Sequence, residues 1–357
     1  GWPQMILQAD ESRITLSYDA RGNITAMEDA QGNVTRYGYD ALNRMTESID
    51  GKGNVTRYTY DIMGNVTRVE NAEGNCQSYE YNASGKVTKV TDFDGESIQR
   101  EYNVLNRPSK IIDKEGRETL LTYDSMWNLA RVTAPDGART TYLYNEENLL
   151  SRIKYADGAV VRYTYDANGN RIGEEDENGA KTTFVYDALG RVVEVNGEEG
   201  LHYAYRYDGE GNLIEAEDAL GNTVSMEYDG NGNLIKETNQ LGESRSYAYT
   251  PLGDVESITD EAGRITCYRY QKGGLLEKIR YADGTEEAFT YDANGNLETH
   301  TLATGFVLRY GYDSMDRIVE ITGSEGERKS YTYDALGNVT SMTDGEGNTT
   351  RYAYTLS

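Results

Sequence analysis

The sequence is poor in the residues that usually hold small domains together or carry metal and cofactor chemistry. It contains two cysteines, four prolines and two histidines in 357 residues. Cys76 and Cys267 lie far apart and in no CxxC arrangement, so the sequence predicts neither a disulfide framework nor a zinc site. His202 and His300 stand without a metal-ligand spacing, and we interpret both as isolated strand substituents. We therefore expect no cofactor, no metal ligand and no catalytic residue.

Long apolar runs and an excess of basic residues are also missing. No apolar stretch approaches the length of a membrane span, and the first ten residues, GWPQMILQAD, lack the basic-then-apolar pattern of a signal peptide. The formal charge is -25, from 60 acidic and 35 basic residues. Such a charge would repel a phosphate backbone or an anionic membrane, so we expect neither nucleic acid nor membrane insertion. It is compatible with a highly soluble secreted protein whose export signal lies outside this fragment.

Aliphatic residues are scarce, but tyrosine is abundant. Leu, Ile, Val and Phe together number 64 of 357, a proportion at which a highly charged chain is suspected of disorder. Against this stand 31 tyrosines, whose amphipathic rings bury a large area and keep a hydroxyl for water or a partner. The regular spacing of these tyrosines indicates a folded chain.

A strict internal period organises the sequence. A tyrosine recurs every 21 residues, seventeen times and without insertion. The series is Tyr18, Tyr39, Tyr60, Tyr81, Tyr102, Tyr123, Tyr144, Tyr165, Tyr186, Tyr207, Tyr228, Tyr249, Tyr270, Tyr291, Tyr312, Tyr333 and Tyr354. The period indicates a repeat protein rather than separate globular domains. We assign residues 1–12 to the start of the fragment or to a partial repeat, 13–354 to a single array of 21-residue repeats, and 355–357 to a truncated next repeat.

Two further slots in each repeat hold residues typical of turns. Four residues after each of the first sixteen tyrosines the chain has glycine eleven times, asparagine three times, and Asp316 and Trp127 once each. Because Gly, Asn and Asp accept positive φ at low cost, this slot predicts a tight turn, and at Trp127 we expect the following Asn128 to take the left-handed position. Fourteen residues after each of the same tyrosines a second turn slot holds glycine without exception: Gly32, Gly53, Gly74, Gly95, Gly116, Gly137, Gly158, Gly179, Gly200, Gly221, Gly242, Gly263, Gly284, Gly305, Gly326 and Gly347.

The segments between the turns have the pattern of strands. Two residues before the repeat tyrosine stands a second tyrosine in eleven of seventeen cases, which places an aromatic stripe on one face. The other strand has apolar residues six and nine places after the tyrosine, as at Val66 and Val69. This odd spacing predicts a β-bulge or a late strand start. We expect the repeat tyrosines to be buried in the packed face of the sheet, with their hydroxyls satisfied by neighbouring residues in a stacked ladder.

The sequence therefore predicts an all-β fold of continuous antiparallel β-hairpin repeats, with two strands per repeat and about 32 strands between Tyr18 and Tyr354. Because strand twist accumulates, a sheet of that width should coil into a wide spiral or hollow shell. A parallel β-solenoid with one coil per repeat is the alternative. Two similar turns at nearly equal spacing favour successive reversals, and hence the antiparallel ribbon.

The repeat pattern YDxxGNVTxVxDxxGNxTRYxY, as in YDALGNVTSMTDGEGNTTRYAY at 333–354, resembles the YD repeat of the Rhs family. Proteins with such repeats include bacterial Rhs polymorphic toxins, the cocoon-forming component of insecticidal toxin complexes, wall-associated proteins and the animal teneurins. The resemblance implies a β-sheet spiral that forms a hollow shell, which in the toxins encloses a C-terminal toxic domain and in teneurins supports adhesion.

Departures from the family pattern argue against carrying over an activity. The Asp of the Tyr-Asp pair is replaced in six copies, and the C-terminal core signature that carries the self-cleaving acidic residues of the toxins is absent from the sequence. The six replacements are Asn82, Asn103, Asn145, Thr250, Gln271 and Thr355. Acidic turns such as 344–348 lack the spacing of an EF-hand, and the GxG strings at 51–53 and 209–211 precede no helix. We interpret the carboxylates as a solvated surface.

The leading interpretation is a non-enzymatic structural YD-repeat shell or scaffold segment of a large exported bacterial protein. It would enclose or present a toxin or effector domain outside this fragment, and its partners would be the cargo or capping domains of the same protein. The alternative is an adhesin or fibre on the cell surface that binds carbohydrate through repeated Tyr, Asn and Asp faces. Either interpretation places the protein outside the cell or on the bacterial surface.

Overall fold

The computed structural model describes residues 2–354, so the predicted truncated repeat at 355–357, with Thr355, lies outside the described residues. The described residues form 34 β-strands and one turn of 3-10 helix, η1 (Glu198–Gly200), and they contain no α-helix. None of the described residues forms a helix long and apolar enough to cross a membrane. The all-β prediction is confirmed, and the strands that follow Tyr18, β3 to β34, number 32 as expected.

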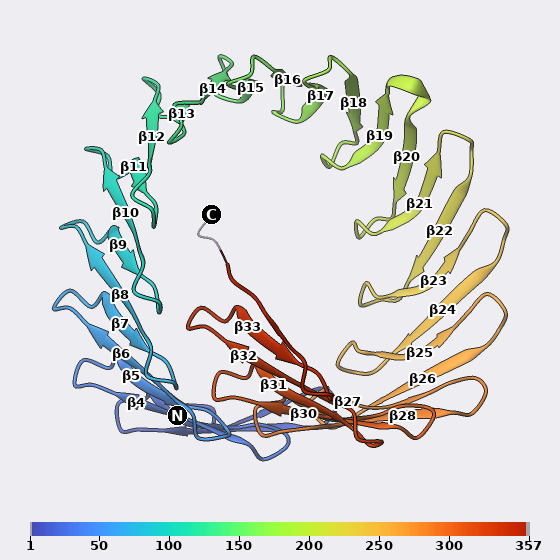
Figure 1. Cartoon of the computed structure of the whole chain (residues 1–357). Coiled ribbons are helices and arrows are strands. Elements are labelled where there is room, and N and C mark those ends of the chain that lie inside the picture. The colour runs from blue at the N-terminus through green and yellow to red at the C-terminus, as the bar shows by residue number, and fades with distance from the viewer. Residues whose placement is uncertain (1, 355–357) are drawn as a thin grey trace. The chain divides into compact units, whose positions relative to one another are not determined.

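The strands alternate with short turns along the whole array (Figure 1). In chain order the first seventeen are β1 (Met5–Leu7), β2 (Arg13–Tyr18), β3 (Ile24–Glu28), β4 (Val34–Tyr39), β5 (Met45–Ile49), β6 (Val55–Tyr60), β7 (Val66–Glu70), β8 (Cys76–Tyr81), β9 (Val87–Thr91), β10 (Ser97–Tyr102), β11 (Pro108–Ile112), β12 (Glu118–Tyr123), β13 (Leu129–Thr133), β14 (Arg139–Tyr144), β15 (Leu150–Lys154), β16 (Val160–Tyr165) and β17 (Arg171–Glu175). The remaining seventeen are β18 (Lys181–Tyr186), β19 (Val192–Gly197), β20 (His202–Tyr207), β21 (Leu213–Asp218), β22 (Thr223–Tyr228), β23 (Leu234–Thr238), β24 (Ser244–Tyr249), β25 (Val255–Thr259), β26 (Ile265–Tyr270), β27 (Leu276–Arg280), β28 (Glu286–Tyr291), β29 (Leu297–Thr301), β30 (Val307–Tyr312), β31 (Ile318–Gly323), β32 (Arg328–Tyr333), β33 (Val339–Thr343) and β34 (Thr349–Arg351).

The chain divides into two compact units. Unit 1 comprises the described residues up to Gln99, Ala248–Thr259, and those from Gly263 onward. Unit 2 comprises Arg100–Tyr247 and Asp260–Ala262. In each unit the strand pairs are antiparallel and join strands that are neighbours in sequence, as for β4 with β5 in unit 1 and β16 with β17 in unit 2. All 34 strands are assigned to one sheet. Successive reversals thus replace the parallel solenoid that the sequence left open.

Fourteen of the hairpins that follow a repeat tyrosine contain a β-bulge at that tyrosine. In β6 and β7, Tyr60 pairs with Val66 and Tyr58 with Val69, and the register shifts between Thr59 and Tyr60. One residue of β7, Thr67, therefore has no direct partner across the hairpin. This confirms the bulge predicted from the odd apolar spacing. It also brings both tyrosines and both valines to one face of the hairpin, since cross-strand partners share a face.

The two turns of most repeats have the same backbone construction. In the turn after the tyrosine, the amide of Asp61 donates to the carbonyl of Asn65 at 2.9 Å and the amide of Gly64 donates to the carbonyl of Asp61 at 3.2 Å. In the other turn, the amide of Asp50 donates to the carbonyl of Asn54, and the amide of Gly53 donates to the carbonyl of Asp50, both at 3.1 Å. The fourth turn residue has positive φ in both cases, 93° at Gly64 and 91° at Gly53.

Trp127 corrects one prediction from the sequence. Trp127 itself adopts φ 67°, and Asn128 does not take the left-handed position in its place. The reason lies in the fixed length of the turn, because the amide of Trp127 donates to the carbonyl of Asp124 at 3.1 Å, as the glycine amide does in other repeats. Moving the left-handed residue by one position would break that bond. The turn geometry therefore overrides the conformational preference of the residue.

The sheet has little fully buried interior. Leu16 and Val161, with 8% and 6% exposure, are the only apolar residues among residues 2–354 that count as buried. The repeat tyrosines of the strands are half-buried, so the expectation that they would be buried is wrong. A single sheet explains this result, because the tyrosine face has only neighbouring hairpins to pack against and no second layer covers it.

Positive φ gives the first test of the turn. Gly230 and Gly232 occupy one turn, and φ is 82° at Gly232 but outside the positive region at Gly230. We expect Gly232→Ala to lower the free energy of unfolding by about 1 kcal/mol, because an alanine side chain is strained in the left-handed region. Gly230→Ala is the matched control, since a Cβ there would meet nothing within 4 Å. Urea unfolding monitored by circular dichroism measures both, and equal effects would contradict the assignment.

Candidate functional site: the tyrosine face and the turn seam

The repeat tyrosines join neighbouring repeats through their hydroxyl groups. Tyr60 Oη donates to the carbonyl oxygen of Met45 at 2.6 Å, and Tyr228 Oη donates to that of Leu213 at 2.9 Å. The acceptor always lies 15 residues before the tyrosine. This bond is made by fourteen of the repeat tyrosines, namely Tyr18, Tyr39, Tyr60, Tyr81, Tyr123, Tyr144, Tyr165, Tyr186, Tyr207, Tyr228, Tyr270, Tyr312, Tyr333 and Tyr354. The predicted hydroxyl ladder is therefore present.

The bulge explains why this carbonyl accepts a side-chain bond. Pairing between β7 and β8 covers only Arg68 to Glu70, so Val66 lies beyond the paired part of the two strands. Tyr81 Oη donates to the Val66 carbonyl at 2.6 Å and supplies the bond that the ladder does not. A half-buried carbonyl without a partner would cost free energy comparable to a lost hydrogen bond. The tyrosine thus completes the hydrogen bonding of the preceding repeat.

The Asp of the Tyr-Asp pair caps the turn. In the turn after Tyr60, Asp61 Oδ1 accepts the amides of Met63 at 2.8 Å and Asn65 at 2.9 Å, and Asp61 Oδ2 accepts Asn65 Nδ2 at 2.8 Å. The Asn65 side chain, followed by its backbone amide, holds the pKa of Asp61 below its ordinary value, although desolvation opposes this. The side chain closes the turn on itself, which is how Asx turns favour a reversal.

Substituted copies keep this capping function. Asn82 Oδ1 accepts the amides of Ser84 and Lys86 at 2.9 and 3.0 Å. Thr250 Oγ1 accepts the amide of Asp254 at 3.2 Å. A side-chain oxygen is what the turn requires, and a negative charge is dispensable. The tolerance for Asn and Thr at this position therefore follows from its structural role.

Arginine replaces the last asparagine of some turns and connects adjacent repeats. Arg44 Nε donates to Asp40 Oδ2 at 2.7 Å, its Nη1 donates to the Asp61 carbonyl at 2.8 Å, and its guanidinium lies 4.7 Å from the centre of the Tyr60 ring. The same three contacts recur with Arg191 and Arg317. Sequence reasoning missed this clamp, although an Arg five places after the repeat tyrosine would have signalled it.

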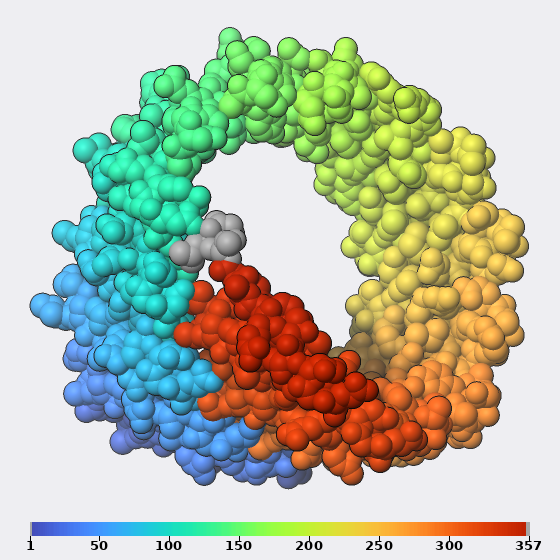
Figure 2. Space-filling view, viewed as in Figure 1, coloured from blue at the N-terminus to red at the C-terminus, as the bar shows by residue number. Residues whose placement is uncertain are grey.

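In unit 1, turns from the two ends of the chain meet edge to edge. We call this contact the turn seam. On one side it contains the turns 29–33, 50–54 and 71–75, and on the other the turns 271–275, 292–296 and 313–317. Figure 2 shows the two segments of unit 1, blue and orange to red, lying against each other. The seam thus joins the second turn of early repeats to the first turn of late repeats.

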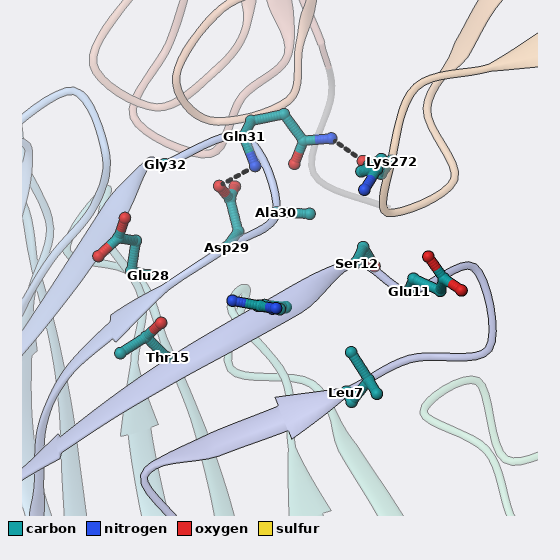
Figure 3. Close-up of a pocket in the computed structure, with 11 residues that line it drawn as sticks. Leu7, Glu11, Ser12, Thr15, Glu28, Asp29, Ala30, Gln31, Gly32 and Lys272 are labelled. Atoms are coloured by element: carbon teal, nitrogen blue, oxygen red, sulfur yellow. Dashed lines mark hydrogen bonds between the residues drawn. The ribbon is translucent and has the colours of Figure 1, made fainter.

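Hydrogen bonds and ion pairs hold the seam. At one end, Gln31 Nε2 donates to the Lys272 carbonyl at 2.5 Å beside a cleft of about 690 Å³ (Figure 3). At the other end, Arg317 Nη2 lies 2.5 Å from Glu73 Oε1. Backbones also approach closely, since a Cβ on Gly51 would lie 2.3 Å from the carbonyl oxygen of Ala293. The contact is therefore polar, tight and made mainly by turn residues.

The centre of the seam is a cluster around Lys52. Lys52 Nζ lies 3.1 Å from both Asp292 Oδ2 and Asp316 Oδ1. Asn294 Nδ2 donates to Asp50 Oδ2 at 2.7 Å and to Asp316 Oδ2 at 3.0 Å. Desolvation lowers the pKa of Lys52, but the hydrogen bonds that its Nζ donates to Asp316 and Asp292 outweigh this and raise that pKa above its ordinary value. The cluster therefore keeps its lysine protonated and its charges paired.

The two histidines and the two cysteines form no shared site. His202 and His300 are on β20 and β29, and neither ring is alone. His202 Nδ1 lies 2.8 Å from Asn196 Oδ1, and His300 Nε2 lies 2.6 Å from Glu287 Oε2 with its ring stacked on Phe289. Both cysteines are free thiols. Among residues 2–354 no group of three His, Cys, Asp or Glu side chains is arranged to hold a metal ion.

Comparison with known proteins identifies the repeat. The family model described as Teneurin YD-shell matches residues 138–253 and 175–324, and the model described as RHS Repeat matches residues 18–55, 64–97 and 333–356. The teneurin matches alone cover residues 138–324, more than half of the chain. No curated protein matches the chain.

Several solved structures share the fold. The crystal structure of TcdB2-TccC3-Cdc42 is 14% identical in sequence and matches with a TM-score of 0.75. The match covers 92% of this chain and 21% of the chain in that structure. The structure of the Photorhabdus luminescens Tc holotoxin pore, with a TccC3 point mutation, is 17% identical in sequence and matches with a TM-score of 0.78. The match covers 96% of this chain and 22% of the chain in that structure. This chain therefore spans about a fifth of the length of those chains.

The hydroxyl ladder can be tested on one strand. Tyr37 and Tyr39 both lie on β4, and only Tyr39 makes the ladder bond, to the Ile24 carbonyl at 2.9 Å. We expect Tyr39→Phe to lower the free energy of unfolding by about 1 to 2 kcal/mol, because the carbonyl loses its partner. Tyr37→Phe keeps the same ring chemistry and is the control, with an expected loss below about 0.5 kcal/mol. Equal losses in chemical denaturation would show that the hydroxyl bond is unimportant.

The capping carboxylates predict an acid-sensitive fold. Hydrogen bonds lower the folded pKa of Asp166, Asp208 and Asp229. The largest contribution in each turn comes from the side chain of the asparagine four residues later. Each ionised cap therefore stabilises the fold above the unfolded pKa of about 4, and its contribution is lost as pH falls through the lower folded value.

A variant with all three aspartates changed to asparagine separates charge from capping. We expect a smaller drop in thermal midpoint between pH 6 and 2 than in the parent protein, since the variant lacks three carboxyl groups whose folded pKa is lowered. Glu146→Gln with Glu147→Gln is the control, because this change removes turn carboxylates that cap no turn. In this control the drop in thermal midpoint between pH 6 and 2 should match that of the parent. An unchanged drop in the triple variant would refute the capping explanation.

Proposed function

The chain belongs to the YD-repeat family that includes RHS repeats and teneurin YD shells, and we propose that it is a non-enzymatic wall segment of a larger exported bacterial protein. In this proposal residues 13–354 act as a single repeat array that coils into a hollow shell. The shell encloses or presents a toxin or effector domain that lies outside these residues. Its partners are the cargo and capping domains of the same protein.

One observation carries this proposal: the repeated polar groups are committed to holding the fold. The Tyr60 hydroxyl serves the preceding repeat, the Asp61 carboxylate serves its own turn, and Arg44 joins the two repeats. Catalysis requires groups that converge on a substrate, whereas these groups recur at regular intervals along the sheet. The Tc holotoxin pore shares this fold, and the matching family model is described as a YD-shell, so we extend a shell function to this chain as a proposal.

The mechanism is geometric. Each repeat is fixed to its neighbours by strand pairing, the hydroxyl ladder and, in places, an arginine clamp, and each added hairpin with the same backbone extends the wall. A continuous hydrogen-bonded sheet has no gaps through which a protease could reach an enclosed chain. A net charge of -25 keeps such a wall soluble and discourages association between walls.

Small-angle X-ray scattering tests the hollow shell. We expect a pair-distance distribution skewed toward long distances, with a radius of gyration larger than that of a filled globule of 357 residues, about 21 Å. Scattering at several protein concentrations controls for association. A profile typical of a filled globule or of a straight rod would contradict the shell.

A cleft on the tyrosine face supports carbohydrate binding as a second candidate function. Phe306, Tyr310 and Tyr331 line a cleft of about 660 Å³ in unit 1, with Arg328 and Asp344 also in its lining. Exposed aromatic faces stack on the apolar side of a pyranose, and charged side chains supply hydrogen bonds to its hydroxyl groups. The adhesin function requires saturable binding at this cleft.

A glycan array separates the two functions. If the protein is an adhesin, it should bind one class of glycan saturably, and Tyr331→Ala should weaken that binding at least about tenfold. Tyr37→Ala is the control, because it removes a stripe tyrosine elsewhere on the sheet. Saturable binding that Tyr331→Ala abolishes would favour the adhesin. The wall segment alone predicts no saturable glycan binding.

A further inference from the structure

The regularity of this protein creates a problem of register at the turn seam. The repeats follow one another every 21 residues without insertion, so the turns on each side of the seam present nearly the same backbone at each step. Sliding one side past the other by a single repeat would leave the backbone contacts almost unchanged. Spreading that shift over the intervening strands costs little at each pair, since the twist between neighbouring strands varies widely. Backbone geometry alone therefore does not select one register.

Selection must come from side chains that differ between repeats, and the centre of the seam contains two such residues. Among the sixteen residues found thirteen places after a repeat tyrosine, Lys52 is the only lysine or arginine. Among the sixteen residues found four places after a repeat tyrosine, Asp316 is the only acidic one, in a slot otherwise held by Gly, Asn or Trp. These two exceptional residues lie 264 positions apart and form an ion pair with Nζ 3.1 Å from Oδ1.

We propose that Lys52, together with Asp292, Asn294 and Asp316, is a register key that selects which repeats face each other across the turn seam. Lys52 is one-quarter exposed and neutralises two carboxylates that would otherwise repel each other. Asn294 bridges the sides by donating to Asp50 and by accepting the Lys52 amide at 3.2 Å. Glu73 with Arg317 adds a second ion pair one repeat further along. Such polar contacts are best known for fixing register in otherwise uniform assemblies.

Slipped registers lose these contacts. If the early side moved forward by one repeat, Lys52 would face Asp313, but Gly337 would replace Asp316 and Met315 would replace Asn294. Glu73 would then face Asn338 in place of Arg317.

A slip by one repeat in the opposite direction is worse for the lysine. Gln271 would take the place of Asp292, Gly273 that of Asn294, and Gly295 that of Asp316, so Lys52 would lose both carboxylates. Glu73 would face Asn296. The native register is thus the one of the three that satisfies every member of the cluster.

Moving the lysine to another repeat should shift the register of the turn seam. The variant Gln31→Lys with Lys52→Gln transfers the lysine to the preceding repeat, at the equivalent position, and leaves the net charge unchanged. The transferred lysine can then reach Asp292 and Asp316 only if the turn 29–33 slides onto the turn 292–296. We expect the slipped register to gain on the order of tenfold relative to the native one, as for partly buried ion pairs.

Thiol cross-linking in the full chain reports the register. Cys76 and Cys267 are first changed to serine, and Ala30→Cys is combined either with Lys272→Cys, for the native register, or with Ala293→Cys, for the slipped one. Ala30 is suited to this because its Cβ lies 2.9 Å from the position of a Cβ on Gly273, next to Lys272. A short bismaleimide links the thiols, and mass spectrometry measures the ratio of native to slipped product.

The parent protein should give almost only the native product, and the moved key should lower the ratio on the order of tenfold. Lys52→Arg should keep the native product, since it preserves the charge, and Lys236→Gln is the control for loss of a lysine whose ion pair, with Glu227, lies away from the seam. Far-ultraviolet circular dichroism verifies that each variant has folded.

A moved-key variant that is folded and keeps the parent ratio would overturn the proposal. Lys52→Gln alone provides a second measurement that needs no slipped product. It should weaken native cross-linking and make it less dependent on salt, because the screened ion pairs are gone. Native cross-linking that is unchanged in yield and in salt dependence would also count against the key.

Discussion

The structure depends on the hydrogen bond that fourteen of the repeat tyrosines donate to the carbonyl 15 residues earlier, as Tyr60 and Tyr81 do. The bulge beside the repeat tyrosine brings the tyrosine stripe and the apolar residues to one face, but it also leaves a carbonyl outside the strand ladder. The hydroxyl group resolves this conflict, because it reaches the carbonyl while the ring packs over the adjacent strand. Phenylalanine could supply the ring alone. This accounts for tyrosine at the fourteen positions that make the bond, although the residue two places earlier varies.

A single-layer sheet must obtain its stability from nearest neighbours. Only two apolar residues among residues 2–354 are buried, so no central core holds distant hairpins together. Instead each repeat contributes its own capped turns and a set of bonds to the adjacent repeat, which is the energetic pattern of a linear repeat array. Lowered carboxyl pKa values at the turns follow from the same design, since the caps work best as acceptors when ionised.

Local features were predictable from the sequence, whereas distant contacts were not. Glycine spacing predicted the turns, and the six-and-nine spacing at Val66 and Val69 predicted the bulge, because both depend on residues within one hairpin. Trp127 was mispredicted because the turn hydrogen bonds fix the left-handed position whatever residue occupies it. The pairing of Lys52 with Asp316 depends on where the ribbon returns after more than 240 residues. No pattern within a single repeat predicts which two distant turns meet.

The turn seam also limits how such a protein can change in length. Gain or loss of a whole repeat is the simplest change for a tandem array, because it preserves every hairpin, turn cap and hydroxyl bond on both sides of the junction. A repeat lost between the two sides of the seam would nevertheless leave Lys52 opposite the wrong turn. Length variation in these proteins is therefore not neutral even when it is perfectly periodic. A lineage that changes its repeat number must change a few charged turn residues at the same time, so those residues depend on how many repeats the array contains.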